Sequence, residues 1–178
     1  SDNIFAVAQL LRMNESIESL YDVTKITPYF LESIKRIVEK ENDLKAHVGD
    51  VDVLLSAKKM GFSDPFIAKL WGCSELDVCA LRKENGIVPV FRMVDTLHAG
   101  AYTPYFYSSY TGKNDSVLTD RKKAVVLGAG PIRIGQGVEF DYSTVHAVTT
   151  IKNSGYEAII INNNPETVST DYTTADKL

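Results

Sequence analysis

The stretch AVVLGAGPIRIGQGVEFDYSTVHA, residues 124–147, decides the fold of the C-terminal part of this chain. Its apolar start, residues 124–127, leads into a loop that carries four glycines, and a helix-like segment follows. A second apolar run, residues 158–161, then ends in NNNPE, residues 162–166. The order strand, glycine loop, helix, strand is typical of the start of a nucleotide-binding α/β domain. We therefore predict a parallel β-α-β unit from residue 121 onward.

Neither of two common phosphate-binding motifs fits the glycine loop. Residues 130–135 have the G-x-x-x-x-G spacing of a P-loop, but Gln136 and Gly137 stand where the phosphate-binding lysine and the magnesium-binding hydroxyl are required. The dinucleotide fingerprint G-x-G-x-x-G fails because one residue too many precedes the next glycine. The second apolar run also ends in Asn162, where an acid would normally bind the ribose. The sequence excludes a P-loop and argues against NAD binding.

An anion site at this loop stays open on physical grounds. Closely spaced glycines let backbone N–H groups approach an anion, and we predict that Asp141 caps a helix over residues 142–154. Arg133 adds a cation, while Glu139 and Glu166 follow the loop and the second strand. Because both strand ends lie at one edge of a parallel sheet, we expect these three charges to converge. The alternative is a structural ion pair between Arg133 and Glu139 that holds the loop.

The first 88 residues predict a series of helices. The expected ranges are 3–12, 28–48, 50–60, 63–72 and 74–84. Two of them have clear start signals: Thr27-Pro28, with proline at the first helical position, and SELD at 74–77, which has the form of a capping box. Helices this short are not stable alone, so we expect them to pack together in an all-α domain.

The segment between the helices and the glycine loop has a different composition. Residues 87–94 (IVPVFRMV) predict an extended chain, and five aromatic residues follow within residues 101–110. We interpret these rings as the cover of a domain junction, because a stacking site for a ligand would have basic neighbours. Residues 111–116 (TGKNDS) predict a polar linker. We therefore divide the chain into residues 1–120, helical with an extended aromatic-rich end, and residues 121–178.

The bulk composition excludes several classes of protein. The chain has 178 residues, of which 44% are hydrophobic and 24% charged, and its net charge is −4. This acidic balance argues against nucleic acid as a partner and against a helix-turn-helix at residues 63–85. No apolar run approaches the roughly 20 residues that a membrane span needs. Cys73 and Cys79 lack a metal-ligand spacing, so we interpret them as free thiols and expect a cytoplasmic protein.

The glycine loop and NNNPETVSTDY at 162–172 resemble the large subunit of carbamoyl-phosphate synthetase. The resemblance extends back through PVFRMVDT at 89–96 and YFYSSY at 105–110, and more weakly into the helices around residues 59–70. It implies a helical oligomerisation domain. The first part of a Rossmann-like pre-ATP-grasp subdomain would follow, which belongs to the carbamate-phosphorylating half of the large subunit. The fold class is therefore mixed: an all-α domain, then an incomplete α/β unit.

The resemblance also implies a role for the loop. The large subunit of this family has two ATP-grasp halves, one phosphorylating bicarbonate and the other carbamate, and an enclosed tunnel carries the carbamate because it decomposes quickly in water. The matching positions at the far end of that tunnel are Arg133, Gly137, Glu139 and Glu166. Gly137 would keep the passage wide, and the charged side chains would shape its polarity.

The same resemblance sets what we expect of catalysis and partners. The family's ATP contacts and Mg²⁺ (or Mn²⁺) ligands lie further along its chain, so we assign no catalytic, cofactor-binding or metal-binding residue here and expect an inactive fragment. Expected partners are the glutaminase small subunit and a second copy, bound through the helical domain. The sequence departs from the family at two places. Asn163 stands where the family frequently has cysteine, and LHAG at 97–100 replaces the family's usual run of small and acidic residues. The alternative hypothesis is a free-standing module that binds an anion or nucleotide.

Overall fold

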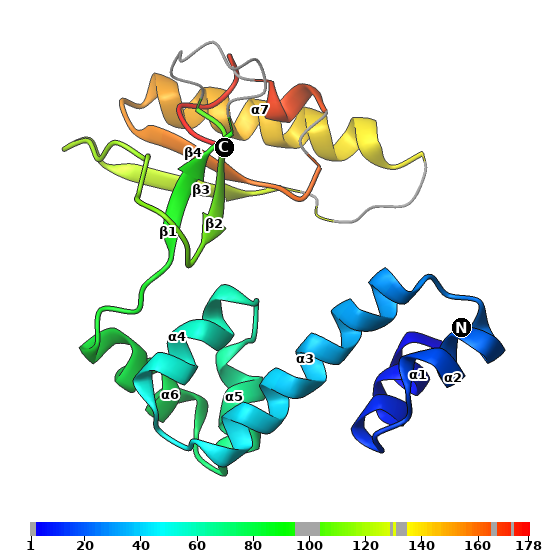
Figure 1. Cartoon of the computed structure of the whole chain (residues 1–178). Helices are drawn as coiled ribbons and strands as arrows, with labels where there is room; N and C mark the ends of the chain where they lie inside the picture. The colour runs from blue at the N-terminus through cyan, green and yellow to red at the C-terminus, as the bar shows by residue number, and fades with distance from the viewer. Residues whose placement is uncertain (1–2, 95–103, 129, 131–134, 165–166, 172) are drawn as a thin grey trace. The chain divides into compact units, whose positions relative to one another are not determined.

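The computed structural model describes residues 3–94, 104–128, 130, 135–164, 167–171 and 173–178. The chain divides into two compact units, Ser1–Val88 and Pro89–Leu178 (Figure 1). The first unit is helical, and the second combines two small β-sheets with one long helix. The expected mixed fold, an all-α part followed by a small α/β part, is confirmed.

The helical unit contains six helices among its described residues. They are α1 (Asn3–Arg12), α2 (Ile17–Thr24), α3 (Pro28–Ala46), α4 (Val51–Lys59), α5 (Asp64–Trp71) and α6 (Glu75–Glu84). All five predicted helices are confirmed within a few residues, but α2 was not predicted. Ser16 caps its start, with Oγ accepting a hydrogen bond from the Ser19 amide at 3.1 Å. The end of α2 lacks the glycine that often follows a helix, because Lys25 itself adopts the left-handed conformation there, at φ +56°.

Local capping explains where several of these helices begin and end. The capping box of α6 is confirmed: the Ser74 hydroxyl accepts from the Asp77 amide, and the Asp77 carboxylate accepts from the Ser74 amide at 2.9 Å. Gly72 ends α5 at φ +69°, a conformation that costs glycine little. At α3, proline occupies the first turn as predicted, but the Thr27 side chain makes no capping hydrogen bond.

The core of the helical unit is built around α3. One cluster of buried side chains joins α1 and α2 to the first half of α3 and comprises Val7, Leu11, Ile17, Leu20, Leu31 and Val38. Fully buried leucine and isoleucine side chains lie at its other end, where α3 contacts α4 and α5: Leu44, Leu54 and Ile67. The Trp71 indole N–H donates to the Leu44 carbonyl at 2.8 Å, which fastens α5 to α3. Figure 1 shows α3 running past both groups of helices.

The second unit contains an antiparallel and a parallel pair of strands. Strands β1 (Val90–Met93) and β2 (Phe106–Ser109) form the antiparallel pair. Strands β3 (Lys123–Leu127) and β4 (Glu157–Ile161) are parallel and in register from Lys123 opposite Glu157 to Leu127 opposite Ile161. The crossover between them is α7 (Gly137–Asn153), so the predicted parallel β-α-β unit is confirmed. A short 3₁₀ turn, η1 (Val168–Thr170), follows β4.

Helix α7 covers one face of the parallel pair (Figure 1). Its Val148 packs with Ala158 and Ile160 of β4 in a small buried core. The helix begins at Gly137, however, and not at residue 142 as predicted. The prediction that Asp141 is the N-cap is therefore wrong. Gly135, just before α7, and Gly137, its first residue, give the helix start the appearance of a loop in the sequence. The carboxylate of Asp141 binds the segment after β4, as described below.

Contacts within the chain place the boundary between the two units after Val88, and the domain boundary predicted at residue 120 stays a prediction. Segment 89–120 lies in the second unit, because backbone hydrogen bonds tie it to the C-terminal residues. The Phe106 amide donates to the Leu178 carbonyl at 2.7 Å, and the Leu178 amide donates to the Pro104 carbonyl at 2.8 Å. Such long-range pairing leaves no mark in the local sequence pattern of either segment.

Candidate functional site

The structure describes only two of the four residues that were predicted to form a site. Gly137 is the first residue of α7 and is half-buried, and Glu139 lies in the first turn of the same helix with its side chain exposed. Arg133 and Glu166 lie outside the described residues. Their convergence with Glu139, and the alternative ion pair between Arg133 and Glu139, therefore stay predictions.

The described parts of the glycine loop lie next to the end of β4. The Gly128 amide donates to the Ile161 carbonyl at 2.8 Å, which continues the pairing of the strands beyond their last residues. A Cβ atom at Gly128 would meet Cγ of Asn162 at 2.8 Å, so any other residue there would require the Asn162 side chain to move. Gly130 and Gly135 have φ of +64° and +92°, where side chains are strained. These glycines are required by the path of the loop.

Asp141 joins α7 to the segment that follows β4. Its Oδ1 accepts hydrogen bonds from the hydroxyls of Thr167, at 2.7 Å, and Ser169, at 2.6 Å. Its Oδ2 accepts from the Val168 amide at 3.0 Å. Burial alone would raise the pKa of Asp141, but the hydrogen bonds from Ser169 and Thr167 lower it below its ordinary value. The carboxylate is therefore ionised and holds the start of η1.

An apolar groove of about 890 Å³ lies beside these segments, on the second unit. Residues from β1, β2, β3 and β4 line it, among them Phe91, Phe106, Val125 and Ile159. Asn162 and Asn163, at the end of β4, also contribute to its wall. The lining is mainly apolar, so the groove is suited to cover by apolar side chains.

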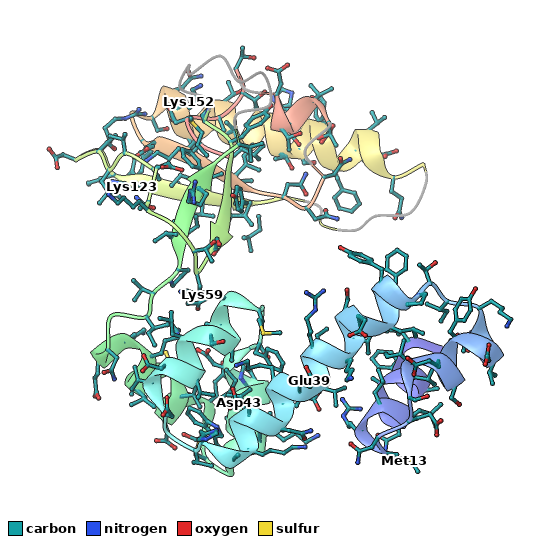
Figure 2. The ribbon with its side chains drawn as sticks, in the orientation of Figure 1. Met13, Glu39, Asp43, Lys59, Lys123 and Lys152 are labelled. Atoms are coloured by element: carbon teal, nitrogen blue, oxygen red, sulfur yellow. The ribbon has the colours of Figure 1, made fainter. Side chains whose placement is uncertain are left out.

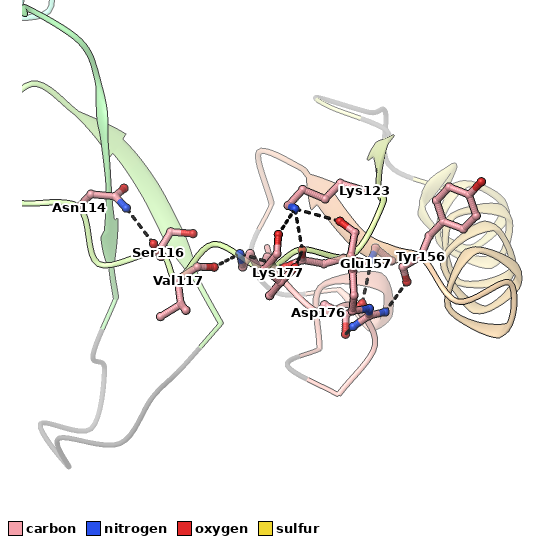
Figure 3. Close-up of polar contacts among 11 residues, drawn as sticks. Asn114, Ser116, Val117, Lys123, Tyr156, Glu157, Asp176 and Lys177 are labelled. Atoms are coloured by element: carbon pink, nitrogen blue, oxygen red, sulfur yellow. Dashed lines mark hydrogen bonds and ion pairs between the residues drawn. The ribbon is translucent and has the colours of Figure 1, made fainter.

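A cluster of charged residues lies at the opposite, amino end of β4 and was not predicted. Figure 3 shows Lys123 and Lys177 turned toward Glu157, whose side chain is only 2% exposed. The ammonium of Lys177 lies 2.9 Å from Glu157 Oε1, and the Thr119 hydroxyl donates to Oε2. The hydrogen bond from Thr119 and the ion pair with Lys177 lower the pKa of Glu157 against the effect of burial. The cluster ties together three segments that are distant along the chain, those of Thr119–Lys123, Glu157 and Lys177.

Lys123 and Lys152, labelled in Figure 2, had no role assigned from the sequence, and each donates hydrogen bonds to backbone carbonyls. The Lys152 ammonium donates to the Thr174 carbonyl at 3.1 Å, and the Lys123 ammonium donates to the Arg121 carbonyl at 3.0 Å.

No group of three or more His, Cys, Asp or Glu residues within the described ranges could hold a metal ion. Cys73 and Cys79 are free thiols. Among the helices that the structure describes, none is long and apolar enough to cross a membrane.

Comparison with protein-family models gives two matches, in the same order along the chain as the two units. Residues 1–86 match the oligomerisation domain of the carbamoyl-phosphate synthetase large chain. Residues 120–178 match the carbamoyl phosphate synthase preATP-grasp domain. The first match supports self-association of the chain, and both matches point to a ligase family. The two matches fall on successive domains of one large chain, and the chain belongs to the carbamoyl-phosphate synthetase large-chain family.

Proposed function

We propose that this chain forms part of the large subunit of a glutamine-hydrolysing carbamoyl-phosphate synthase. Its helical unit serves self-association, and its glycine loop forms part of the wall of a carbamate tunnel. The observation that carries the proposal is the succession of two matches to domains of one large chain, each falling on its own part of the fold. This order agrees with a single polypeptide that continues from an oligomerisation domain into a synthetase half.

The reaction of such an enzyme makes carbamoyl phosphate from bicarbonate, ATP and ammonia released from glutamine. A glutaminase small subunit is the proposed source of the ammonia, and ATP with Mg²⁺ or Mn²⁺ is the proposed cofactor. The part of the chain that the structure describes contains no metal-binding cluster. On the resemblance in sequence, we place ATP and metal binding in other parts of the large subunit and expect these 178 residues to be inactive alone.

Three features support a wall role for the glycine loop. Gly137 starts α7 and has no side chain that could narrow a passage beside the helix. Gly128 lies in close contact with Asn162, so the first residue of the loop lies against the end of β4. Glu139 presents a carboxylate from the first turn of α7. Arg133 and Glu166 complete the proposed wall through the resemblance in sequence. An enclosed passage is chemically necessary because carbamate decomposes quickly in water.

The experiment that tests the tunnel is Gly137→Leu in a synthetase large subunit that carries these residues, assayed with its small subunit. A leucine at this position narrows the passage, so glutamine hydrolysis should continue while formation of carbamoyl phosphate falls. The ratio of glutamate to carbamoyl phosphate measures this uncoupling. Thr149→Leu is the matched control, because it adds a similar side chain at an exposed position of the same helix. An unchanged ratio in Gly137→Leu would contradict the tunnel.

Self-association has its own test. Analytical sedimentation of the 178-residue chain should show a molecular mass that increases with protein concentration. A mass that stays monomeric at high micromolar concentration would contradict the proposed role of the helical unit.

A second candidate function is a free-standing module that binds an anion or nucleotide. The start of α7 favours it, since Gln136 at the N-cap makes no side-chain hydrogen bond to the backbone N–H groups there. It predicts heat of binding when ATP or inorganic phosphate is titrated into this chain. Calorimetry without such heat would remove this candidate and leave the synthetase proposal intact.

A further inference from the structure

Lys177 and Leu178 lie as a very short strand between β4 and β2. On the β4 side, the Lys177 amide donates to the Ala158 carbonyl at 3.3 Å, and the Lys177 carbonyl accepts from the Ile160 amide at 2.9 Å. On the β2 side, Leu178 binds segment 104–106 through its own amide and carbonyl. Both patterns are those of parallel strands. The two residues therefore run in the same direction as both neighbouring strands.

Strand β2 has further backbone groups on the edge that faces Leu178. The Val94 amide donates to the Tyr105 carbonyl, which makes these two residues a hydrogen-bonded pair beside the ladder of β1 and β2. Because such pairs alternate in an antiparallel ladder, Phe106 and Ser108 turn their amides away from β1. The Phe106 amide binds Leu178. The Ser108 amide lies two positions further along the same edge, and it has no acceptor among the described residues.

Strand β4 has a matching edge. The Glu157 amide and the Ile161 carbonyl are hydrogen-bonded to the residues that flank β3. Since successive residues of a strand turn their backbone groups to opposite sides, Ile160 and Asn162 face away from β3. The Ile160 amide binds Lys177, whereas the Asn162 amide has no acceptor in the part of the chain that the structure describes. We call the space between Ser108 and Asn162 the strand site.

The apolar groove of the second unit lies along the strand site, since both strand edges and Leu178 line it. Val125 and Ile161 contribute apolar side chains that are 54% and 59% exposed. The Leu178 side chain points to the other face, where it packs with Val148 and Ile160 beneath α7. Because side chains alternate along a strand, the next residue of a continuing strand would face the groove. The residue after it would face α7.

We infer that the strand site binds an extended polypeptide segment as a parallel strand, which joins the two small sheets of the second unit into one. The occupant is the segment that follows Leu178 in the proposed large subunit, and this choice of occupant rests on the proposed function. Lys177 and Leu178 already set the direction and register of this strand. A continuous segment therefore enters without the loss of translational freedom that a separate chain would incur.

The register predicts two new hydrogen bonds. The first residue of the occupant should accept from the Asn162 amide, because Lys177 accepts from the Ile160 amide two positions earlier. The second residue should accept from the Ser108 amide, because Leu178 accepts from the Phe106 amide. The occupant should carry apolar side chains at its first two positions, one over the groove and one beneath α7.

The experiment compares three chains by amide hydrogen exchange. The first is the 178-residue chain, the second carries the addition Val-Val-Val-Thr after Leu178, and the third carries Gly-Ser-Gly-Ser. The third is the matched control, because its addition has the same length but little β propensity and no apolar side chains. With Val-Val-Val-Thr, the Ser108 and Asn162 amides should exchange about tenfold slower or more. Unchanged exchange at both amides would overturn the inference.

A fluorescent probe of the groove gives a second measurement. The dye 1-anilinonaphthalene-8-sulfonate binds exposed apolar surface. Its fluorescence with the second unit should fall when Val-Val-Val-Thr is added and should stay unchanged with Gly-Ser-Gly-Ser. Both measurements are repeated at several protein concentrations. Protection that increases with concentration would show that the addition enters the strand site of a second copy, which would overturn the choice of occupant.

The outcome can be distinguished from that of the tunnel. If Gly137→Leu uncouples the reactions but Val-Val-Val-Thr protects neither amide, the strand site is wrong and the proposed function stands. If both amides are protected but Gly137→Leu leaves the ratio of glutamate to carbamoyl phosphate unchanged, the strand site is supported and the tunnel fails.

Discussion

The two units bury charged groups in different ways. In the helical unit, Asp64 lies between Lys58 and Arg82, at 2.6 and 3.0 Å, and all three belong to the neighbouring helices α4 to α6. In the second unit, Glu157 binds Lys177 and Thr119, which are 20 and 38 positions away along the chain. The Asp64 cluster therefore fastens consecutive helices, whereas the Glu157 cluster fastens segments that are distant along the chain.

The apolar surfaces differ as well. Leu54 and Ile67 of the helical unit are completely buried. The parallel pair of the second unit has α7 on one face, whereas Val125, Leu127 and Ile161 on the other face are more than half exposed. Parallel sheets in proteins are normally covered on both faces. The helical unit closes its own core, and the second unit presents a face that is suited to further cover.

The largest expected effect is the loss of the charge cluster in the helical unit. Asp64→Ala leaves the buried Lys58 and Arg82 without their shared carboxylate, which should destabilise the unit by about 3–5 kcal/mol. Urea unfolding followed by the fluorescence of Trp71, the sole tryptophan, measures this unit. Asp22→Ala is the control, because the Asp22–Lys25 pair is exposed and should contribute at most about 1 kcal/mol. Equal losses in the two variants would contradict the comparison.

A smaller effect should distinguish the two faces of β4. Ile160→Ala removes a fully buried side chain beneath α7 and should cost about 2–5 kcal/mol. Ile161→Ala changes the next residue, which is 59% exposed on the other face, and should cost less than about 1 kcal/mol. Protection of the β4 amides against hydrogen exchange measures both. A similar cost for Ile161→Ala would mean that its face is already covered in solution.

The smallest effect concerns pH. Burial alone would raise the pKa of Asp64, but hydrogen bonds from Lys58 and Arg82 lower it below its ordinary value of 3.8. A lowered pKa in the folded state stabilises the protein above the pKa of the unfolded state, and this contribution is lost as the pH falls through the folded value. The helical unit should therefore lose stability below about pH 4.

Asp64→Asn tests this pH dependence. Its unfolding midpoint, followed through Trp71, should be lower than that of the wild type at neutral pH and should decrease less between about pH 4 and pH 2. Asp22→Asn, which removes the same charge at an exposed position, should retain the wild-type slope. A wild-type slope in Asp64→Asn would show that other groups cause the acid sensitivity.

Much of the helical unit was predictable because its signals are local. Pro28, the Ser74 capping box and Gly72 act within one turn of the helix end that they define. Helix α2 was not predicted because the residue after its last turn is Lys25, which adopts a conformation that is usually found in glycine. Helix α7 was placed too late for a related reason, since its first residue is a glycine. Local composition predicts an element well only where its ends use the usual residues.

The sequence by itself determined the series of helices, the parallel β-α-β unit and the family, because periodicity, caps and long motifs are properties of neighbouring residues. Only the tertiary structure decided that segment 89–120 joins the second unit, that Glu157 pairs with Lys177, and that Asp141 binds the segment from Thr167 to Ser169. A carboxylate accepts hydrogen bonds from whichever donors the folded chain brings within about 3 Å. That choice depends on the path of the whole chain, and a local pattern carries no record of it.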